Sequence, residues 1–229
     1  MPGSTTPTHD QEGCKLFIDT VADSITVVPR DRDVADHGLE PLAAFAVAGV
    51  GDALGRLGLM HSRIRQMTPG RRCAGRALTV WTREGDNLAI HRALDEARPG
   101  DVLVVNAMGE ITRAVFGDLL AEIALASGLA GVVIDGAIRD LEPIRRTRLP
   151  VWSAAVTPAG PTKHGPGQVG VAIACGGVVV SPGDYVTADD DGVAVVPRDQ
   201  VEGVLERLSE IEAFEGALRE RIRETRTTL

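Results

Sequence analysis

Two short apolar segments with a helical segment between them constrain the fold of this chain most strongly. Asp101–Asn106 (DVLVVN) and 130–135 (AGVVID) are rich in β-branched residues, which is typical of strands that are buried on both faces. The segment 117–127 (GDLLAEIALAS) has the pattern of a helix that ends at Gly128. A strand, a helix and a strand of these lengths form a right-handed βαβ unit with parallel strands. The sequence therefore predicts an α/β fold.

The remaining segments extend this unit into one domain. Further strands are predicted at 74–81, Val151–Val156, 177–181, 185–188 and 193–196, and further helices at 41–58, 87–97 and 199–223. The segment 157–168 is rich in Pro and Gly and is predicted to be a loop. We expect a tail and an irregular extension at 1–40 and a single domain at 41–229, because no linker long enough to separate two domains is found.

Charge and composition argue against several classes of protein. The net charge is −8, whereas a general nucleic-acid binder needs clustered Lys and Arg to displace counterions. The apolar stretches are too short to span a bilayer, and residues 1–11 lack the apolar core of a secretory signal. Cys14, Cys73 and Cys175 show no metal-binding spacing and are expected to be reduced thiols. We therefore expect a cytoplasmic protein that binds neither nucleic acid nor membranes.

The chemistry is expected beyond the carboxyl ends of the two central strands, where ligands bind in open parallel sheets. The connection 107–116 leaves the first strand, and the segment 136–141 (GAIRDL) leaves the second strand at the same edge. The start of the central helix and the acidic residue Asp140 should therefore face a common crevice.

The start of the central helix offers a binding site for an anion. If the helix begins at Gly117, the N–H groups of Asp118, Leu119 and Leu120 lack intrahelical acceptors and can bind a carboxylate. The alternative is that Thr112 caps the helix, which would place Gly117 inside it at a cost of about 1 kcal/mol.

Three charged residues are the candidates for catalysis. Arg139 offers a planar fork for a carboxylate or an enolate oxygen, and Asp140 offers a hard oxygen ligand for Mg²⁺ or Mn²⁺. Adjacent side chains rarely face each other, so we expect these two to point at different parts of one pocket; the alternative is a surface ion pair worth under about 1 kcal/mol. Asp118 could transfer protons through a metal-bound water, or could merely complement the helix dipole.

The segments 117–121 (GDLLA) and 131–140 (GVVIDGAIRD) resemble those of the aldolases that cleave 4-hydroxy-4-methyl-2-oxoglutarate and 4-carboxy-4-hydroxy-2-oxoadipate. The same family contains the regulator of ribonuclease activity A. The resemblance continues through 156–158 (VTP), 182–184 (PGD) and 189–193 (DDDGV). It implies a single-domain swivelling β/β/α fold, an αββα sandwich, assembled as trimers or hexamers with sites near subunit boundaries.

The resemblance also implies roles for individual residues. Asp140 would hold the divalent cation, Mg²⁺ or Mn²⁺. The pyruvyl carboxylate would lie on the amides of Leu119 and Leu120, next to Gly117, and Arg139 would contact the 2-oxo oxygen. Asp118 would position a water molecule that acts as acid or base.

A glutamate from the C-terminal helix of a neighbouring subunit would serve the outer shell of the metal. Its position after VPR at 196–198 points to Glu215, and Glu210 and Glu212 remain alternatives.

Cleavage of a 4-hydroxy-2-oxo acid leaves the enolate of pyruvate, whose charge a lysine Schiff base or a metal must stabilise. The chain has only two lysines, Lys15 in the extension and Lys163 in the 157–168 loop, which favours the metal-dependent route. Loss of carbon dioxide from oxaloacetate gives the same enolate, so decarboxylation is a second expected activity.

Two other functions remain as alternatives. The family includes a non-catalytic protein-binding regulator of a ribonuclease, but regulators lack the acid after the arginine, whereas this chain has Asp140. The βαβ unit could also belong to a nucleotide-binding or methyltransferase domain, but no GxGxxG follows Asn106. The sequence therefore favours a lyase that acts on small 2-oxo acids.

Overall fold

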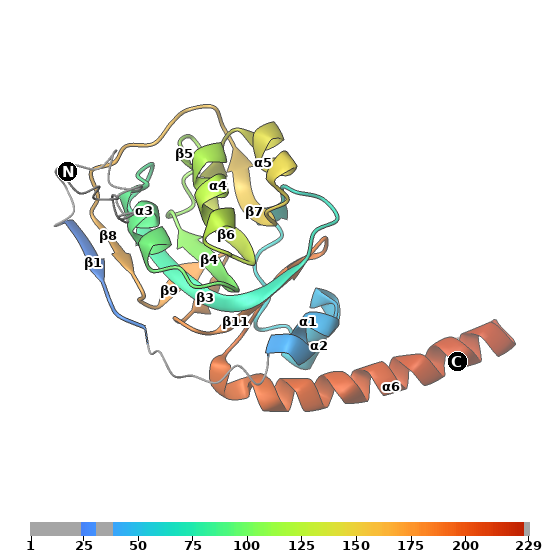
Figure 1. Cartoon of the computed structure of the whole chain (residues 1–229). Coiled ribbons are helices and arrows are strands. Elements are labelled where there is room, and N and C mark those ends of the chain that lie inside the picture. The colour runs from blue at the N-terminus through green and yellow to red at the C-terminus, as the bar shows by residue number, and fades with distance from the viewer. Residues whose placement is uncertain (1–23, 31–38, 227–229) are drawn as a thin grey trace, which may run out of the picture.

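The structure is a computed structural model that describes residues 24–30 and 39–226 (Figure 1). The helices are α1 (Leu39–Ala44), α2 (Val47–Ala53), α3 (Leu88–Asp95), α4 (Asp118–Ala126), α5 (Leu141–Thr147) and α6 (Val201–Thr225). The strands are β1 (Ile25–Val27), β2 (Arg65–Gln66), β3 (Cys73–Thr82), β4 (Asp101–Asn106), β5 (Ala114–Phe116), β6 (Gly131–Ile138), β7 (Val151–Val156), β8 (Gly167–Val169), β9 (Ile173–Cys175), β10 (Val178–Val180), β11 (Tyr185–Asp189) and β12 (Gly192–Val196).

A mixed sheet forms the centre of the domain, with the strand order β1-β8-β3-β4-β6-β7-β2. β3, β4, β6 and β7 are parallel to one another, which confirms the predicted βαβ unit. β11 adds to β3 antiparallel and continues into the β11–β12 hairpin, while β9 and β10 form a separate two-stranded sheet.

The layers follow from the alternation of side chains along the central strands. On β4, Leu103 and Val105 face the helices α3, α4 and α5, whereas Val102 and Val104 face β9–β10 and β11–β12. Every one of these side chains is buried, as expected for parallel strands covered on both sides. A third apolar cluster packs α1, α2 and the start of α6 on the outer side of β11 and β12. The αββα sandwich is therefore confirmed.

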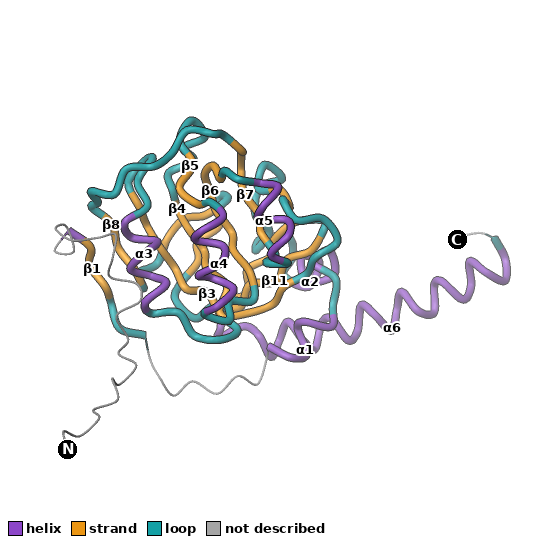
Figure 2. The backbone as a smooth tube through the Cα atoms, turned by 45° about the horizontal axis from the view of Figure 1, so that its top comes forward, coloured by secondary structure: helices purple, strands orange, loops and turns teal. Residues whose placement is uncertain are grey.

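The long C-terminal helix leaves the domain after its first turns. The buried residues of α6 are Val201, Val204 and Leu208, and the rest of the helix projects away from the sheet (Figures 1 and 2). Within residues 24–30 and 39–226, no helix has both the length and the apolar character that crossing a membrane requires.

The N-terminal part of the chain differs from prediction in two places. Residues 25–27, within the extension expected to be irregular, form β1 and pair parallel to β8. The helix predicted at 41–58 is two helices, α1 and α2, because Ala46 is extended (φ −70°, ψ 147°). Gly55, in a left-handed conformation with φ 62°, lies in the turn that follows α2.

The strand predicted at 130–135 is longer, because β6 continues to Ile138. Gly136 interrupts its apolar pattern, but Ala137 and Ile138 pair with β5 on one side and β7 on the other. Neither β5 nor α5 was predicted. Pro143 argues against a helix in the sequence, yet it occupies the first turn of α5, where proline is tolerated.

The parallel direction of four strands sets the position of the site. β3, β4, β6 and β7 all end at one edge of the sheet, so the segments that follow them gather there. This edge carries Asn87 after β3, Gly117 at the end of the segment after β4, Arg139 after β6 and Lys163 after β7.

Candidate active site

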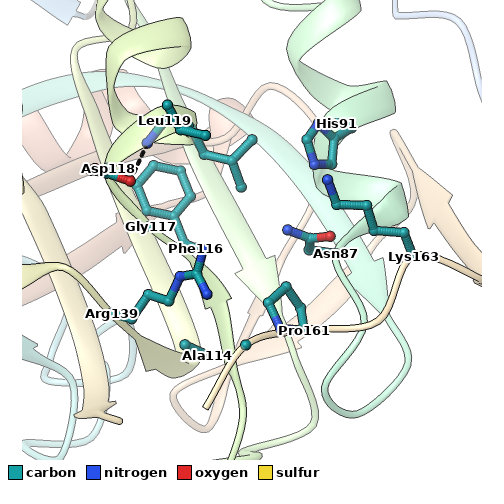
Figure 3. Close-up of a pocket in the computed structure, with 12 residues that line it drawn as sticks. Asn87, His91, Ala114, Phe116, Gly117, Asp118, Leu119, Arg139, Pro161 and Lys163 are labelled. Atoms are coloured by element: carbon teal, nitrogen blue, oxygen red, sulfur yellow. Dashed lines mark hydrogen bonds between the residues drawn. The ribbon is translucent and has the colours of Figure 1, made fainter. Parts of the chain in front are cut away.

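A cavity of about 240 Å³ opens at this edge of the sheet (Figure 3). One wall is formed by the start of α4, from Phe116 to Leu120, together with Arg139. The opposite wall carries Asn87, His91 and Lys163. The cavity therefore brings together chain segments far apart in the sequence, and its lining includes Arg139 and Asp118 as predicted. Asp140, which was expected to face the same crevice, is not part of the lining and lies beside it, against Arg139.

The helix begins where one of the two sequence hypotheses placed it. Gly117 is the N-cap residue of α4, and its carbonyl oxygen accepts the first intrahelical bond from the Ala121 N–H at 3.0 Å. Thr112 lies outside the helix, with its N–H and its hydroxyl group bonded to the carboxylate of Glu110. The Thr112 alternative is therefore wrong.

One expected anion-binding group has an internal partner. The Leu119 N–H donates to Asp118 Oδ1 at 2.8 Å, contrary to the prediction that it is unpaired (Figure 3). A short carboxylate at the first helical position can turn back onto the next N–H, which reduces the charge at the helix end. Rotation of the Asp118 side chain would release this N–H for a ligand, and the Asp118 and Leu120 N–H groups have no intrahelical acceptor.

Gly117 allows Arg139 and Asp140 to approach the helix start closely. A Cβ atom at Gly117 would lie 2.7 Å from Asp140 Oδ2 and 3.2 Å from both Cγ and Nε of Arg139. The backbone also joins the two elements, because the Arg139 N–H donates to the Phe116 carbonyl oxygen at 2.9 Å. The glycine is therefore needed for contact rather than for an unusual dihedral, since its φ of −144° suits any residue.

The side chains of Arg139 and Asp140 contact each other, contrary to prediction. Arg139 Nε lies 3.1 Å from Asp140 Oδ2. The cause is the left-handed backbone of Asp140 (φ 55°, ψ 43°), which turns the chain sharply between β6 and α5. Both side chains are more than a third exposed, so the ion pair is weak and either partner can be exchanged for a ligand.

The guanidinium group of Arg139 is confined on its other side by the loop after β7. A Cβ atom at Gly160 would lie 2.9 Å from Arg139 Nη1. The loop is held there by a hydrogen bond from the Ala114 N–H to the Ala159 carbonyl oxygen at 2.8 Å. Arg139 thus lies between two glycines, and only small residues on both sides leave room for it.

The wall opposite Arg139 contains two buried polar atoms without a partner. Asn87 is 4% exposed, and neither its Oδ1 nor Nε2 of His91 makes a hydrogen bond within the described part of the chain. Unsatisfied buried polar atoms are rare and suggest a missing ligand or water. The ammonium-bearing side chain of Lys163 lies beside the His91 ring (Figure 3).

Sequence reasoning missed all three of these residues. The sequence predicts Asn87 only as the start of a helix and Lys163 only as part of the 157–168 loop. Their common signal is position, since each follows a parallel strand at the edge where Arg139 lies. Using that signal requires knowing that β3 and β7 belong to the same parallel sheet as β4 and β6.

His91 is expected to remain neutral at physiological pH. Burial, and then the positive charge of Lys163, lower the pKa of His91 from its ordinary 6.5 to about 4. An NMR titration should therefore show no protonation of this imidazole between pH 6 and 7. Because the unfolded chain binds this proton below about pH 6.5 and the folded chain does not, the free energy of unfolding should decrease as pH falls from 6.5 toward 4. His91→Gln should remove that part of the pH dependence, and a midpoint near 6.5 in the folded protein would contradict it.

The donors at the site suit one kind of metal ion. Within residues 24–30 and 39–226, no group of three or more His, Cys, Asp or Glu side chains is placed to hold a metal. Mg²⁺ and Mn²⁺ need few protein ligands, since Mg²⁺ is commonly bound by one or two carboxylates and several waters. Asp140, which is partly exposed next to the helix start, fits such an ion, whereas a structural zinc site would need more side chains.

The C-terminal helix does not bring its glutamates to Asp140 within one chain. Glu215 Oε2 accepts a hydrogen bond from Arg219 at 2.6 Å on the projecting part of α6 (Figure 1). Glu210 and Glu212 are exposed on the same helix. A role for any of them at the metal would require a second copy of the chain.

The fold and the site together define an α/β protein in which a helix start and an Arg–Asp pair meet at the edge of a parallel sheet. Residues 32–195 match the RraA-like family, described as Aldolase/RraA. The chain therefore belongs to this family, as its sequence motifs indicated.

Similar proteins include some named as aldolases and one described within a ribonuclease-inhibitor family. A protein of Halalkalibacterium halodurans named "Putative 4-hydroxy-4-methyl-2-oxoglutarate aldolase" is 41% identical over 168 residues, covering 73% of this chain and 80% of the relative. The 4-hydroxy-4-methyl-2-oxoglutarate aldolase of Thermus thermophilus is 39% identical over 127 residues, covering 56% and 77%. The crystal structure of Streptomyces coelicolor RraAS2, described as an unusual member of the RNase ES inhibitor RraA protein family, has 31% identity and a TM-score of 0.76, covering 83% of this chain and 99% of that chain.

Proposed function

We propose that this protein is a divalent-metal-dependent aldolase that cleaves 4-hydroxy-2-oxo acids, such as 4-hydroxy-4-methyl-2-oxoglutarate, and releases pyruvate. The observation that carries the proposal is that the α4 start and Arg139 line one cavity, with Asp140 beside them. The Arg139 N–H, which donates to the Phe116 carbonyl oxygen, joins the two elements, and the absence of a side chain at Gly117 leaves room for both charged groups. The aldolase names of the relatives support the same reaction class.

The start of α4 would bind the carboxylate of the 2-oxo acid. The N–H groups of Leu119 and Leu120 point out of the first helical turn, where the helix dipole favours an anion. The Asp118 carboxylate would turn away from Leu119 when the substrate arrives. This places the 2-oxo group of the substrate next to Arg139.

Arg139 would stabilise the negative charge that develops during cleavage, and Asp118 would assist proton transfer. A base removes the proton of the 4-hydroxyl group, the C3–C4 bond breaks, and its electron pair forms the enolate of pyruvate. The Arg139 guanidinium would hydrogen-bond the enolate oxygen where the negative charge develops. A water molecule held by Asp118 would then deliver a proton to C3.

Asp140 would hold Mg²⁺ or Mn²⁺, which would supply Lewis acidity at the 2-oxo oxygen. The same pocket residues would stabilise the enolate that forms when oxaloacetate loses carbon dioxide. Oxaloacetate decarboxylation is therefore a second activity that we propose for this site.

The opposite wall of the cavity would bind the far end of the substrate. Lys163 supplies a positive charge, Asn87 Oδ1 supplies an unpartnered acceptor, and His91 Nε2 supplies an unpartnered ring nitrogen. A 4-hydroxy-2-oxo acid with a second carboxylate would match this wall. Its second carboxylate would pair with Lys163, and its hydroxyl group would donate a hydrogen bond to Asn87 Oδ1. The wall therefore supports dicarboxylic substrates over simple ones.

We further propose a homo-oligomer, a trimer or hexamer, in which α6 reaches a neighbouring subunit. Beyond Leu208, a heptad pattern places Ile211, Glu215, Leu218 and Ile222 on one face of the projecting helix. An apolar stripe of this kind needs a partner surface. Glu215 lies within the stripe, and we propose that it serves the outer shell of the neighbour's metal, with Glu210 and Glu212 as alternatives.

The proposal is tested by measuring pyruvate release from a panel of 4-hydroxy-2-oxo acids and oxaloacetate, with Mg²⁺ or Mn²⁺ present. Turnover should stop when EDTA is added and return when excess Mg²⁺ is restored, because the enolate charge then lacks its Lewis acid. Activity that persists in EDTA and is trapped by borohydride would instead assign a Schiff base to Lys163.

A protein-binding regulator remains the second candidate, because RraAS2 is described within an inhibitor family. Absence of pyruvate release from every substrate, together with inhibition of a ribonuclease by the purified protein, would favour it.

A further inference from the structure

Asp86 is a buried carboxylate that accepts hydrogen bonds from two separate parts of the chain. It is 0% exposed and lies just after β3. From the start of α3 it accepts the Leu88 N–H at 3.0 Å. From the loop after β7 it accepts the hydroxyl group of Thr162 at 2.8 Å and the N–H groups of His164 at 2.7 Å and Gly165 at 3.1 Å.

Backbone hydrogen bonds join the same two segments. The Asn87 N–H donates to the Thr162 carbonyl oxygen at 3.0 Å, and the Thr162 N–H donates to the Gly85 carbonyl oxygen at 2.8 Å. Asn87 and Lys163 are direct chain neighbours of residues in this network. The network therefore holds the backbone of Asn87 and Lys163, the two residues whose side chains lie on the wall opposite Arg139.

The hydrogen bonds favour the ionised form of Asp86. Burial alone would raise the pKa of this carboxyl group, but the donors, with the His164 N–H first among them, outweigh burial and lower the pKa below its ordinary value. A neutral amide in its place would present N–H atoms to some of these donors. The negative charge of Asp86 therefore suits its surroundings, because the Leu88, Thr162, His164 and Gly165 groups all donate hydrogen bonds to its carboxylate.

The two ends of the loop after β7 are held independently. Near Arg139, the loop is held by the hydrogen bond from the Ala114 N–H to the Ala159 carbonyl oxygen. Near Lys163, it is held by Asp86. Loss of Asp86 should thus loosen the Lys163 end while leaving the Arg139 end in place.

We propose that Asp86 is a positioning residue that makes the site selective for 2-oxo acids with a second anionic group. It holds the loop 162–165 against the start of α3, so that Lys163 and Asn87 face Arg139 across the cavity. This inference rests on the proposed aldolase function and adds a specificity device to it.

The test compares two reactions of the Asp86→Asn variant. Cleavage of 4-hydroxy-4-methyl-2-oxoglutarate uses both walls of the cavity, whereas exchange of pyruvate methyl protons with deuterated water needs only the Arg139 wall. We expect kcat/KM for cleavage to fall by about tenfold to a hundredfold, mainly through KM, because a charged hydrogen bond to the substrate is lost. Proton exchange should fall by less than about threefold on the same reasoning, as its ligand never reaches Lys163.

A double-mutant cycle shows whether Asp86 acts through Lys163. If it does, the variant with both Asp86→Asn and Lys163→Met should cleave no more slowly than Lys163→Met alone. Amide hydrogen exchange should also increase at His164 and Gly165 in Asp86→Asn. If this variant fails to fold, Thr162→Val can replace it, because it removes one donor from the same network. Cleavage should again fall more than proton exchange, but by a smaller factor than in Asp86→Asn.

Equal losses of cleavage and proton exchange, or additive losses in the cycle, would overturn the positioning role. If the wild-type protein performs neither reaction, the proposed aldolase function itself fails. The two failures are therefore distinguishable.

Discussion

Asp140→Ala is expected to lower kcat/KM for pyruvate release by about a thousandfold or more, because the proposed metal ligand is removed and several kcal/mol of charge stabilisation by the metal are lost with it. The fold should persist, since the side chain is partly exposed and its ion pair with Arg139 is weak. The left-handed backbone at φ 55° adds a cost of about 1–2 kcal/mol for Ala.

Asp140→Asn separates these two effects. Asn tolerates the left-handed conformation nearly as well as Asp, so this variant keeps the backbone and loses only the charge. It should be about as inactive as Asp140→Ala but more stable in urea unfolding. Asp52→Ala is the matched control, because Asp52 also forms an exposed ion pair, with Arg56 at 3.5 Å, and lies on α2. Full activity in Asp140→Asn would remove the charge of Asp140 from the mechanism.

Asp140→Ala also tests the proposed role of Glu215. If Glu215 acts on a neighbouring subunit, mixing inactive Asp140→Ala and Glu215→Ala subunits creates some sites with both native residues. Partial recovery of activity is then expected. Confirmed mixing of subunits without any recovery would count against Glu215, and repeating it with Glu210→Ala and Glu212→Ala would test the alternatives.

Gly117→Ala is expected to lower kcat/KM by about a hundredfold, because small displacements of catalytic groups have effects of this size. The new Cβ would lie 2.7 Å from Asp140 Oδ2 and 3.2 Å from two atoms of Arg139, so both side chains must move. The free energy of unfolding should fall by only about 1 kcal/mol, since the atom at 2.7 Å belongs to a mobile side chain and Ala is merely a poorer N-cap.

Gly203→Ala provides the control for this substitution. Gly203 lies in α6, where its Cβ would meet Arg207 Nη1 at an ordinary 3.5 Å. Ala should therefore stabilise the helix by up to about 1 kcal/mol without changing turnover. Measuring kcat/KM and the free energy of unfolding in urea for Gly117→Ala and Gly203→Ala tests these expectations. Native kcat/KM in Gly117→Ala would show that the positions of Arg139 and Asp140 do not depend on the space left by Gly117.

The sequence determined the centre of the fold and one wall of the site. The strands β4 and β7 match their predicted bounds. For β4 the reason is its buried run of Val and Leu, which has few other conformations. The start of α4 at Gly117 and the cavity positions of Asp118 and Arg139 follow from local rules for helix ends and parallel sheets. Such rules act over a few residues, so the sequence alone contains them.

Only the tertiary structure decided the rest of the site. The end of β6 at Ile138 depends on pairing with β5 and β7, and the contact between Arg139 and Asp140 depends on a left-handed turn between β6 and α5. The second wall joins segments that are more than seventy positions apart. Asp86, next to Asn87, accepts a hydrogen bond at 2.7 Å from the N–H of His164, next to Lys163. No local pattern marks these residues, because their neighbours in space are chosen by the order of strands in the sheet.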